Sequence, residues 1–487
     1  MYRVGQPIVM ARVVIPEDPR GGFGKSQMKR NDPRVVLLAA GIGNVIVMLD
    51  TSIVNVALER ISLDLGSDVT SLQWIVNAYV LLFASLLLLG GALGDAFGSR
   101  RIYVTGLAVF TAASLASGFA PSTEVLIATR ATQGVGAAML MPCSLALLTR
   151  TYSDSARRAK AIATLSSWGG IALIVGPIAG GLLVTAFNWR SIFLVNVPIG
   201  LLGIWLTLGT AGEPDARSQR RIDYAGLLSL AVSMILATAI LIEGGQLGWG
   251  SPWIVGASVL ALTSFGAFIA VERSARSPIL PPHLFANSTF SWIGYVFVAG
   301  AGAFFGLLFV LSLFFQKVEG YSPLEAGAAL LPLSVGVVLG NTSSRKLVSR
   351  TDPLRLMLVG SGVRLLGFLA LAFADVALSH TLIGAVLLVI GIGAGLGSPM
   401  STAIFMSTVE RSYTGIASGI ARAASQVGSA MGVAIFGSFL SGARGISNSL
   451  SIAASWAAIV TASILAVNVY LLLRAGTTQT PGVSRAD

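Results

Sequence analysis

The chain has 487 residues, of which 54% are hydrophobic and only 11% are charged. Roughly a quarter of the residues in a soluble domain are charged. Too few polar side chains are therefore present to coat the several soluble domains that this length would otherwise suggest. A single cysteine excludes a disulfide framework, and two histidines leave little for a zinc site. We expect no metal and no cofactor.

The first 34 residues are rich in Arg, Lys, Pro and Gly, without an apolar core ahead of a small-residue cleavage site. This composition is not that of a signal peptide. We predict a cytoplasmic N-terminal tail over residues 1–34, which either sets the membrane topology or contacts anionic lipids.

Fourteen apolar runs follow, each suited to a spanning helix of about 20 residues. Only helices or closed barrels satisfy the backbone in lipid, and these runs are too long for barrel strands. The sequence therefore predicts an all-α polytopic membrane protein with 14 transmembrane helices. The predicted spans are 35–58, 72–93, 102–119, 124–149, 160–185, 191–210, 224–243, 253–271, 290–316, 323–343, 354–375, 381–409, 415–440 and 452–473.

The basic residues are distributed unevenly between the two sides of these spans. With both termini cytoplasmic, 25 of the 32 Lys and Arg residues fall on the inner side and four on the outer side. Arg130, Arg364 and Arg422 lie within spans. This bias predicts a multi-pass protein of the cell membrane with both termini cytoplasmic. It also accounts for the net charge of +11 without a nucleic acid partner.

A weak internal repeat relates the two ends of the chain. Residues 90–106 and 340–360 each follow a span, carry paired bases and lead into another span. An offset of eight spans pairs the first six spans with the last six, which is typical of alternating-access transporters. We predict an N-terminal six-helix bundle (35–210), a linker with two extra transmembrane helices (211–289), a C-terminal six-helix bundle (290–473) and a cytoplasmic tail (474–487).

Four motifs occur within the first half of the chain. They read LDTSIVNVAL at 49–58, GALGDAFGSRR at 91–101, RATQGVG at 130–136 and GPIAGG at 176–181. In this order they resemble the signatures of the major facilitator superfamily, specifically its fourteen-helix drug:proton antiporter family. The resemblance covers nearly the whole chain beyond the N-terminal tail. It implies the major facilitator fold, with two six-helix halves and two additional central helices.

Asp50 is read as the only acid inside a span, where an isolated carboxylate must pair, hydrate or protonate. The resemblance implies proton coupling by Asp50 and Arg130. Counted from the outer ends of their spans, both residues lie at depths of roughly 10 Å at 1.5 Å per residue, so that they can meet. The alternatives are a structural hydrogen bond for Asp50 and carbonyl binding for Arg130.

The other motifs have implied roles in conformational change. The resemblance assigns a conformational gate to Gly91, Asp95, Gly98, Arg100 and Arg101, with turn chemistry and topology as the alternative. The motif associated with antiporters contains Gly176, Pro177, Gly180 and Gly181. There Pro permits a kink and small residues permit close packing, which alone is the other interpretation.

Asn55, Arg364 and Arg422 are candidates for contact with the substrate. The two arginines have no intramembrane acid to pair with, and the alternative is carbonyl capping or snorkelling. A net charge of +2 within the spans argues against a dedicated exporter of dications.

The sequence favours a proton-coupled antiporter that exports amphiphilic small molecules or drugs and acts as a monomer. A narrow exporter of one metabolite or antibiotic is the main alternative. A proton symporter fits the span 5 motif less well. A membrane enzyme would need a clustered catalytic set, and no phosphate-cradling loop of an ATP-driven pump is present.

Overall fold

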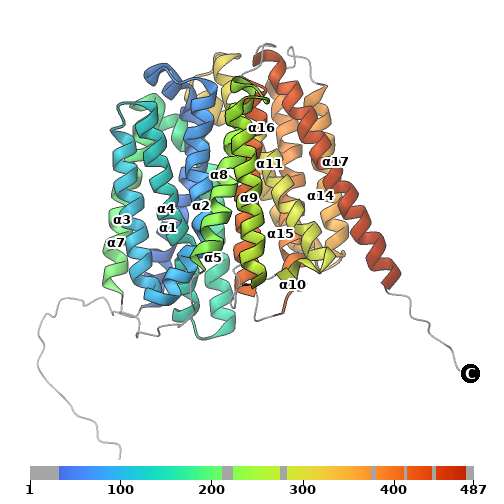
Figure 1. Cartoon of the computed structure of the whole chain (residues 1–487). Coiled ribbons are helices and arrows are strands. Elements are labelled where there is room, and N and C mark those ends of the chain that lie inside the picture. The colour runs from blue at the N-terminus through green and yellow to red at the C-terminus, as the bar shows by residue number, and fades with distance from the viewer. Residues whose placement is uncertain are drawn as a thin grey trace, which may run out of the picture.

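The structure is a computed structural model that describes residues 32–210, 223–274, 282–373, 380–410, 414–440 and 446–478. Within these ranges every regular element is a helix, and the helices stand side by side in one bundle (Figure 1). The predicted tails, 1–34 and 474–487, lie mostly outside the described residues. The helices are α1 (Pro33–Leu65), α2 (Val69–Phe97), α3 (Ser99–Gly118), α4 (Thr123–Thr151), α5 (Ser155–Ala186), α6 (Ser191–Leu194), α7 (Asn196–Gly209), α8 (Tyr224–Leu247), α9 (Pro252–Ser274), α10 (Pro282–Phe285), α11 (Ser288–Lys317), α12 (Pro323–Ala329), α13 (Leu331–Leu347), α14 (Pro353–Ala372), α15 (His380–Ser407), α16 (Thr414–Ser438) and α17 (Ile446–Thr478).

Each of the fourteen predicted spans lies on one helix or on two consecutive helices. The span predicted at 191–210 is divided into α6 and α7, and the span at 323–343 into α12 and α13. Twelve of the described helical segments are long and apolar enough to cross a membrane. The helices α3 and α16 are not among them, because Ser, Thr, Gly and Arg lower their hydropathy. Length and composition thus support twelve of the fourteen predicted spans.

Polar caps and glycines set where the helices begin and end. Asp68 Oδ1 accepts the Ser71 amide at the start of α2, and Asp352 Oδ1 accepts the Leu354 amide at the start of α14. α1 ends at Gly66, whose φ of 66° lies in the left-handed region that favours glycine. These groups satisfy backbone atoms that a helix end leaves without partners.

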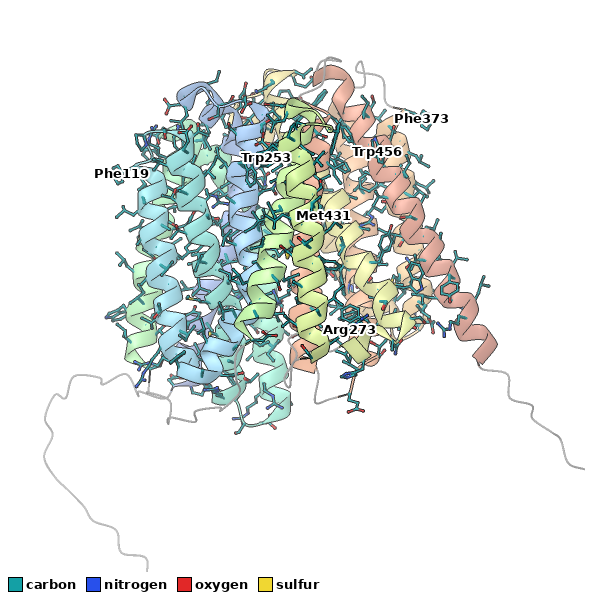
Figure 2. The ribbon with its side chains drawn as sticks, viewed as in Figure 1. Phe119, Trp253, Arg273, Phe373, Met431 and Trp456 are labelled. Atoms are coloured by element: carbon teal, nitrogen blue, oxygen red, sulfur yellow. The ribbon has the colours of Figure 1, made fainter. Side chains whose placement is uncertain are left out.

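The bundle has two ends, which we define by the course of the chain. The terminal face is the end at which α1 begins and α17 ends, and the opposite face is the end at which α1 turns into α2. Phe119 and Phe373 project outward near the opposite face, on either side of the bundle (Figure 2). They are 70% and 85% exposed, and aromatic residues are enriched at this level in membrane proteins.

The helix contacts of the first half of the chain recur in the second half. α2 packs against α4, α3 against α4, and α1 against α5. Eight spans later, α13 packs against α15, α14 against α15, and α11 against α16. In Figure 1 the N-terminal helices (α1–α7, blue to green) and the C-terminal helices (α10–α17, yellow to red) occupy different sides of the bundle. The recurrence is the pattern that the predicted repeat requires.

The helices α8 and α9 pack against each other in front of the boundary between these two groups. α8 also contacts α2 and α16. The polar contacts of α8 with the N-terminal helices go to the first turns of α2 and to the residue just before α2. Trp74 Nε1 donates to Glu243 Oε1 at 2.8 Å, and Gln246 Nε2 donates to Thr70 Oγ1 at 2.5 Å and to Asp68 Oδ2 at 3.2 Å. The hairpin formed by α8 and α9 is therefore attached to the N-terminal helices.

The apolar core is divided unequally between the two ends of the bundle. One cluster, which we call the joint cluster, combines Ile53 and Phe193 of the N-terminal helices with Leu311 and Phe436 of the C-terminal helices. A second cluster lies almost wholly within the N-terminal helices and a third wholly within the C-terminal helices. The joint cluster includes the residues nearest the opposite face, so the two groups of helices are sealed together at that end.

Glycines allow the C-terminal helices α11 and α16 to pack backbone to backbone. A Cβ atom at Gly432 would overlap the carbonyl oxygen of Gly302, and one at Gly428 would overlap that of Val298. Small residues permit this close approach, which drives helix association in a membrane.

We predict that Gly432→Val lowers the free energy of unfolding by about 3 kcal/mol, because the new side chain would force α16 away from α11. Gly294→Val on α11 is the matched control, since nothing lies within 4 Å of a Cβ atom there. Thermal unfolding of the purified variants measures the difference. Equal transition temperatures for the two variants would contradict the close contact.

Candidate functional site: a buried ion pair

A carboxylate and a guanidinium face each other inside the N-terminal helices. Asp50 lies in the middle of α1 and is 0% exposed, and Arg130 lies on α4 and is 1% exposed. Arg130 Nη1 lies 2.5 Å from Asp50 Oδ2. The prediction from sequence that the two side chains meet at one depth is confirmed.

The second carboxylate oxygen of Asp50 accepts hydrogen bonds from two side-chain amides, one on α4 and one on α7. Gln133 Nε2 on α4 lies 3.3 Å from Asp50 Oδ1, and Asn196 Nδ2 on α7 lies 3.2 Å from it. Gln133 Nε2 also donates to Ser114 Oγ of α3 at 2.7 Å. A buried charge is tolerated when it is paired and its remaining lone pairs are hydrogen-bonded, and this site meets both conditions.

Arg130 has partners besides Asp50. Its Nε donates to the carbonyl of Ile75 at 3.2 Å, and its Nη1 donates to Gln133 Oε1 at 2.9 Å. The guanidinium carbon lies 4.4 Å from the centre of the Tyr79 ring and 5.7 Å from that of Phe193. Carbonyl binding, the alternative from sequence, is thus one contact that coexists with the ion pair. None of these contacts involves the carboxylate of Asp50.

The roles of Gln133 and Asn196 were not predicted from the sequence. Gln133 follows Arg130 by three residues and therefore shares its helix face, which is a signal that the motif at 130–136 contained. Asn196 lies in an apolar run, and its contact with Asp50 depends on how α7 packs against α1. Sequence spacing alone does not reveal such a contact.

The predicted gate residues lie at the terminal face but do not form one cluster. Asp95 Oδ1 lies 3.7 Å from Arg150 of α4, and both side chains are exposed. Arg100 instead binds the end of α7, with Nε 3.0 Å from Thr207 O and Nη2 2.7 Å from Leu208 O. Arg101 is exposed. The ion pair of Asp95 that the structure describes therefore lies within the N-terminal helices.

The two glycines of this motif have separate surroundings. Gly98 lies between α2 and α3 with a φ of 94°, which favours glycine because it lacks a Cβ atom. Gly91 on α2 faces the Pro142 side chain, 3.5 Å from an added Cβ atom. Turn chemistry, the alternative from sequence, therefore holds for Gly98.

The motif of α5 packs against two different helices. Added Cβ atoms at Gly176 and Gly180 would overlap Ser52 and Ile53 of α1. An added Cβ at Gly181 would lie 2.6 Å from the carbonyl oxygen of Pro323, in α12. On α12, Gly327 in turn faces the carbonyl of Pro177. The motif thus brings α5 against α1 on one face and against the C-terminal helices on another.

The three candidates for substrate contact differ in their surroundings. Asn55 is buried, its Nδ2 donates to carbonyls of its own helix, and its carbonyl accepts from Ser312 Oγ of α11 at 2.5 Å. Arg364 is 9% exposed within the C-terminal helices. Arg422 is exposed. It shares a face of α16 with Val433 and Phe436, by helical spacing, and these two belong to the joint cluster.

An acid near a helix end was missed. α8 extends to Leu247, so Glu243 lies inside a helix, and the statement that Asp50 is the only acid within a span is wrong. Glu243 accepts from Trp74 Nε1. The predicted span 224–243 already contained Glu243 as its last residue, so this acid was overlooked.

Helices able to span a membrane, in two groups whose packing repeats, are the architecture of polytopic alternating-access transporters. The sequence profile of the Major Facilitator Superfamily matches residues 40–433, and the chain belongs to this superfamily. The structure resembles the crystal structure of a peptide transporter, POT, with a TM-score of 0.64 at 16% identity over 94% of this chain and 96% of that one. The nucleoside transporter NupG gives a TM-score of 0.63 at 13% identity over 89% and 99%.

Several curated relatives are named as resistance or export proteins. The methylenomycin A resistance protein of Bacillus subtilis (strain 168) is 36% identical over 82% of this chain and 86% of its own length. The puromycin resistance protein pur8 of Streptomyces alboniger is 37% identical over 85% and 83%. The multidrug resistance protein Stp of Mycobacterium tuberculosis (strain H37Rv) is 34% identical over 83% and 75%.

We predict that Arg130→Gln lowers the free energy of unfolding by about 3–5 kcal/mol, because Asp50 is left as a buried charge without its partner. The double variant with Asp50→Asn should regain most of the loss, since both charges are then removed. Asp64 and Arg190, an exposed pair at 2.6 Å, serve as the control. Removing that pair should change stability by about 1 kcal/mol or less. Additive effects at Asp50 and Arg130 would argue against a coupled pair.

Proposed function

We propose that this protein is a proton-driven antiporter that exports amphiphilic small molecules across the cell membrane by alternating access and acts as a monomer. The observation that carries the proposal is the enclosed Asp50–Arg130 pair. When Asp50 binds a proton, the buried guanidinium of Arg130 loses its counter-charge and needs other partners. Ile75 O, Gln133 Oε1 and the Tyr79 ring can serve as these partners of Arg130. The site can therefore exist with or without a proton on Asp50.

Export rather than uptake is supported by the relatives, whose names include methylenomycin A resistance and multidrug resistance. The α5 motif with Gly176, Pro177, Gly180 and Gly181 also resembles that of antiporters. A second candidate is a narrow exporter of one antibiotic, because several relatives are named for a single compound, such as the cephamycin export protein of Amycolatopsis lactamdurans.

We propose fourteen spans, arranged as six-helix bundles at 35–210 and 290–473 with a linker at 211–289 that contains α8 and α9. The recurring helix pairs support this division. We place the terminal face in the cytoplasm on the basis of the 25 inner basic residues. With this orientation the joint cluster closes the outer side, and substrate reaches the centre from the cytoplasm.

We propose that Asp95, Gly91, Gly98, Arg100 and Arg101 form the conformational gate. Asp95 and Arg150 are joined at the cytoplasmic end of the N-terminal helices. Exposed pairs of this kind stabilise a fold little, so their exchange of partners between states is inexpensive. The contact of α5 with α12 at Gly181 and Gly327 seals the other end.

Asp50→Asn should reduce pH-driven export to the background of empty vesicles, because Asn keeps the size of the side chain but cannot bind or release the proton. Substrate binding should survive, since coupling is a linkage between two sites. The measurement is transport in sealed inverted vesicles with an imposed pH gradient. Asp64→Asn, an exposed carboxylate, is the control and should keep coupling. Gradient-driven transport by Asp50→Asn at wild-type rate and expression would show that the proton travels by another residue.

Asp95→Asn should lower the transport rate several-fold while leaving expression and thermal stability unchanged, because its ion pair is exposed. Arg150→Gln should give the same phenotype if the two act as partners. Transport rates in vesicles and unfolding temperatures check both statements. A normal transport rate at equal protein level would exclude a gating role for Asp95.

Arg422→Ala should shift substrate preference away from anionic amphiphiles, because this exposed base lies on the α16 face that continues into the joint cluster. Resistance of cells to a panel of anionic, neutral and cationic compounds measures the change. Arg345→Ala, an exposed base on α13, is the control. An unchanged spectrum would favour carbonyl capping as the role of Arg422.

A further inference from the structure

Arg364 is a buried base in the centre of the C-terminal helices, and it has no hydrogen-bond or ion-pair partner among the described residues. It lies in the middle of α14 and is 9% exposed. Its backbone packs against Gly393 of α15, and its guanidinium reaches Gly300 of α11. Its Nε is enclosed and has no hydrogen-bond partner among the described residues.

No carboxylate of the surrounding helices is available to Arg364. Between their bounds, α11 and α13–α17 contain no Asp or Glu. Glu325 in α12 is occupied by the capping box with Ser322 at the helix start. Arg130 provides the comparison, because it is enclosed to a similar degree and has both a carboxylate and a carbonyl as partners. An enclosed cation without an anion is strongly unfavourable.

The two alternatives offered by the sequence for Arg364 do not fit its position. Carbonyl capping would place a backbone oxygen near Nε, and none accepts from it in the part of the chain described. Snorkelling needs a nearby helix end, but Arg364 is roughly 17 Å from Pro353 and roughly 12 Å from Ala372 at 1.5 Å per residue. The charge therefore stays inside the helix group.

A glycine of α11 lies beside this charge, and α17 packs against the helix that carries it. A Cβ atom added at Gly300 of α11 would contact only the two terminal nitrogens of Arg364, at 3.5 and 3.8 Å. The absence of a side chain at Gly300 therefore leaves space next to the guanidinium. On α17, Asn468 Nδ2 donates to Ser361 Oγ at 2.7 Å, which fixes the register of α14 against α17. Thr461 lies two turns before Asn468 on the same face, and its enclosed Oγ1 has no described partner.

We propose that Arg364 binds a small monovalent inorganic anion of chloride size in the space beside Gly300. The anion neutralises the guanidinium within the C-terminal helices. The small exposed fraction of Arg364 excludes a drug-sized ligand. This site is separate from Asp50 and does not depend on the exported substrate.

Thermal unfolding of the purified protein in sodium chloride and in sodium gluconate of equal ionic strength tests the proposal. Chloride should raise the transition temperature of the wild-type protein by several degrees in a saturable manner, because it binds only the folded state. Arg364→Gln should abolish this dependence and should be at least as stable as wild type in gluconate. Arg422→Gln removes an exposed base and should retain the dependence.

A second variant and a direct measurement guard against a folding defect in Arg364→Gln. Gly300→Val keeps the arginine but fills the space beside it, so the chloride effect should be lost. Crystals of the wild-type protein grown with bromide should show anomalous density next to the guanidinium. Chloride stabilisation that persists in Arg364→Gln, or its absence from the wild type, would overturn the proposal. Stabilisation by an anionic substrate alone would overturn it as well and place Arg364 on the transport path.

Discussion

Asp50 and Arg130 can be enclosed together only because each is the other's counter-charge. Removing two ions from water is expensive, and their attraction compensates only when the remaining hydrogen-bonding positions are filled. Here the partners come from α4, α7 and the backbone of α2. The packing of the N-terminal helices is consequently constrained by one electrostatic requirement at their centre. A displacement of α1 relative to α4 would separate charges in a medium of low dielectric constant.

The two seams between the N-terminal and C-terminal helices are chemically different. α5 and α12 meet through backbone at Gly181 and Gly327. α2 and α16 meet through an amide, since Gln73 Nε2 donates to the carbonyls of Val433 and Ala434 at 3.0 and 2.8 Å. The repeat relates the two seams, but the first depends on close apposition and the second on a directional bond. The joint cluster lies between these seams and holds the two groups of helices together at the opposite face.

The positions of the helices and the contact between Asp50 and Arg130 could be predicted from the sequence. The other partners of each side chain could not. Apolar run length predicted helices where the structure has them, and twelve of the described segments are long and apolar enough to cross a membrane, because backbone groups in lipid must be satisfied within a helix. Helix rise placed Asp50 and Arg130 at one depth. Asn196 was missed because contacts between distant helices depend on rotation about each axis. The partner of Asp95 was likewise unpredictable, since several bases lie at the terminal face and only packing selects Arg150.

The attachment of α8 to α2 has a consequence for the lipid around the protein. Glu243 and Gln246 hold the hairpin to the N-terminal helices, while α8 only packs against α16. When the two groups of helices rotate relative to each other, the hairpin is expected to travel with α2 and to slide along α16. It thereby acts as a screen over this seam, and acyl chains are kept out of the gap that such a rotation opens. The seam between α5 and α12 lacks a comparable cover from α8 and α9 and is the side on which lipid can reach the moving surface.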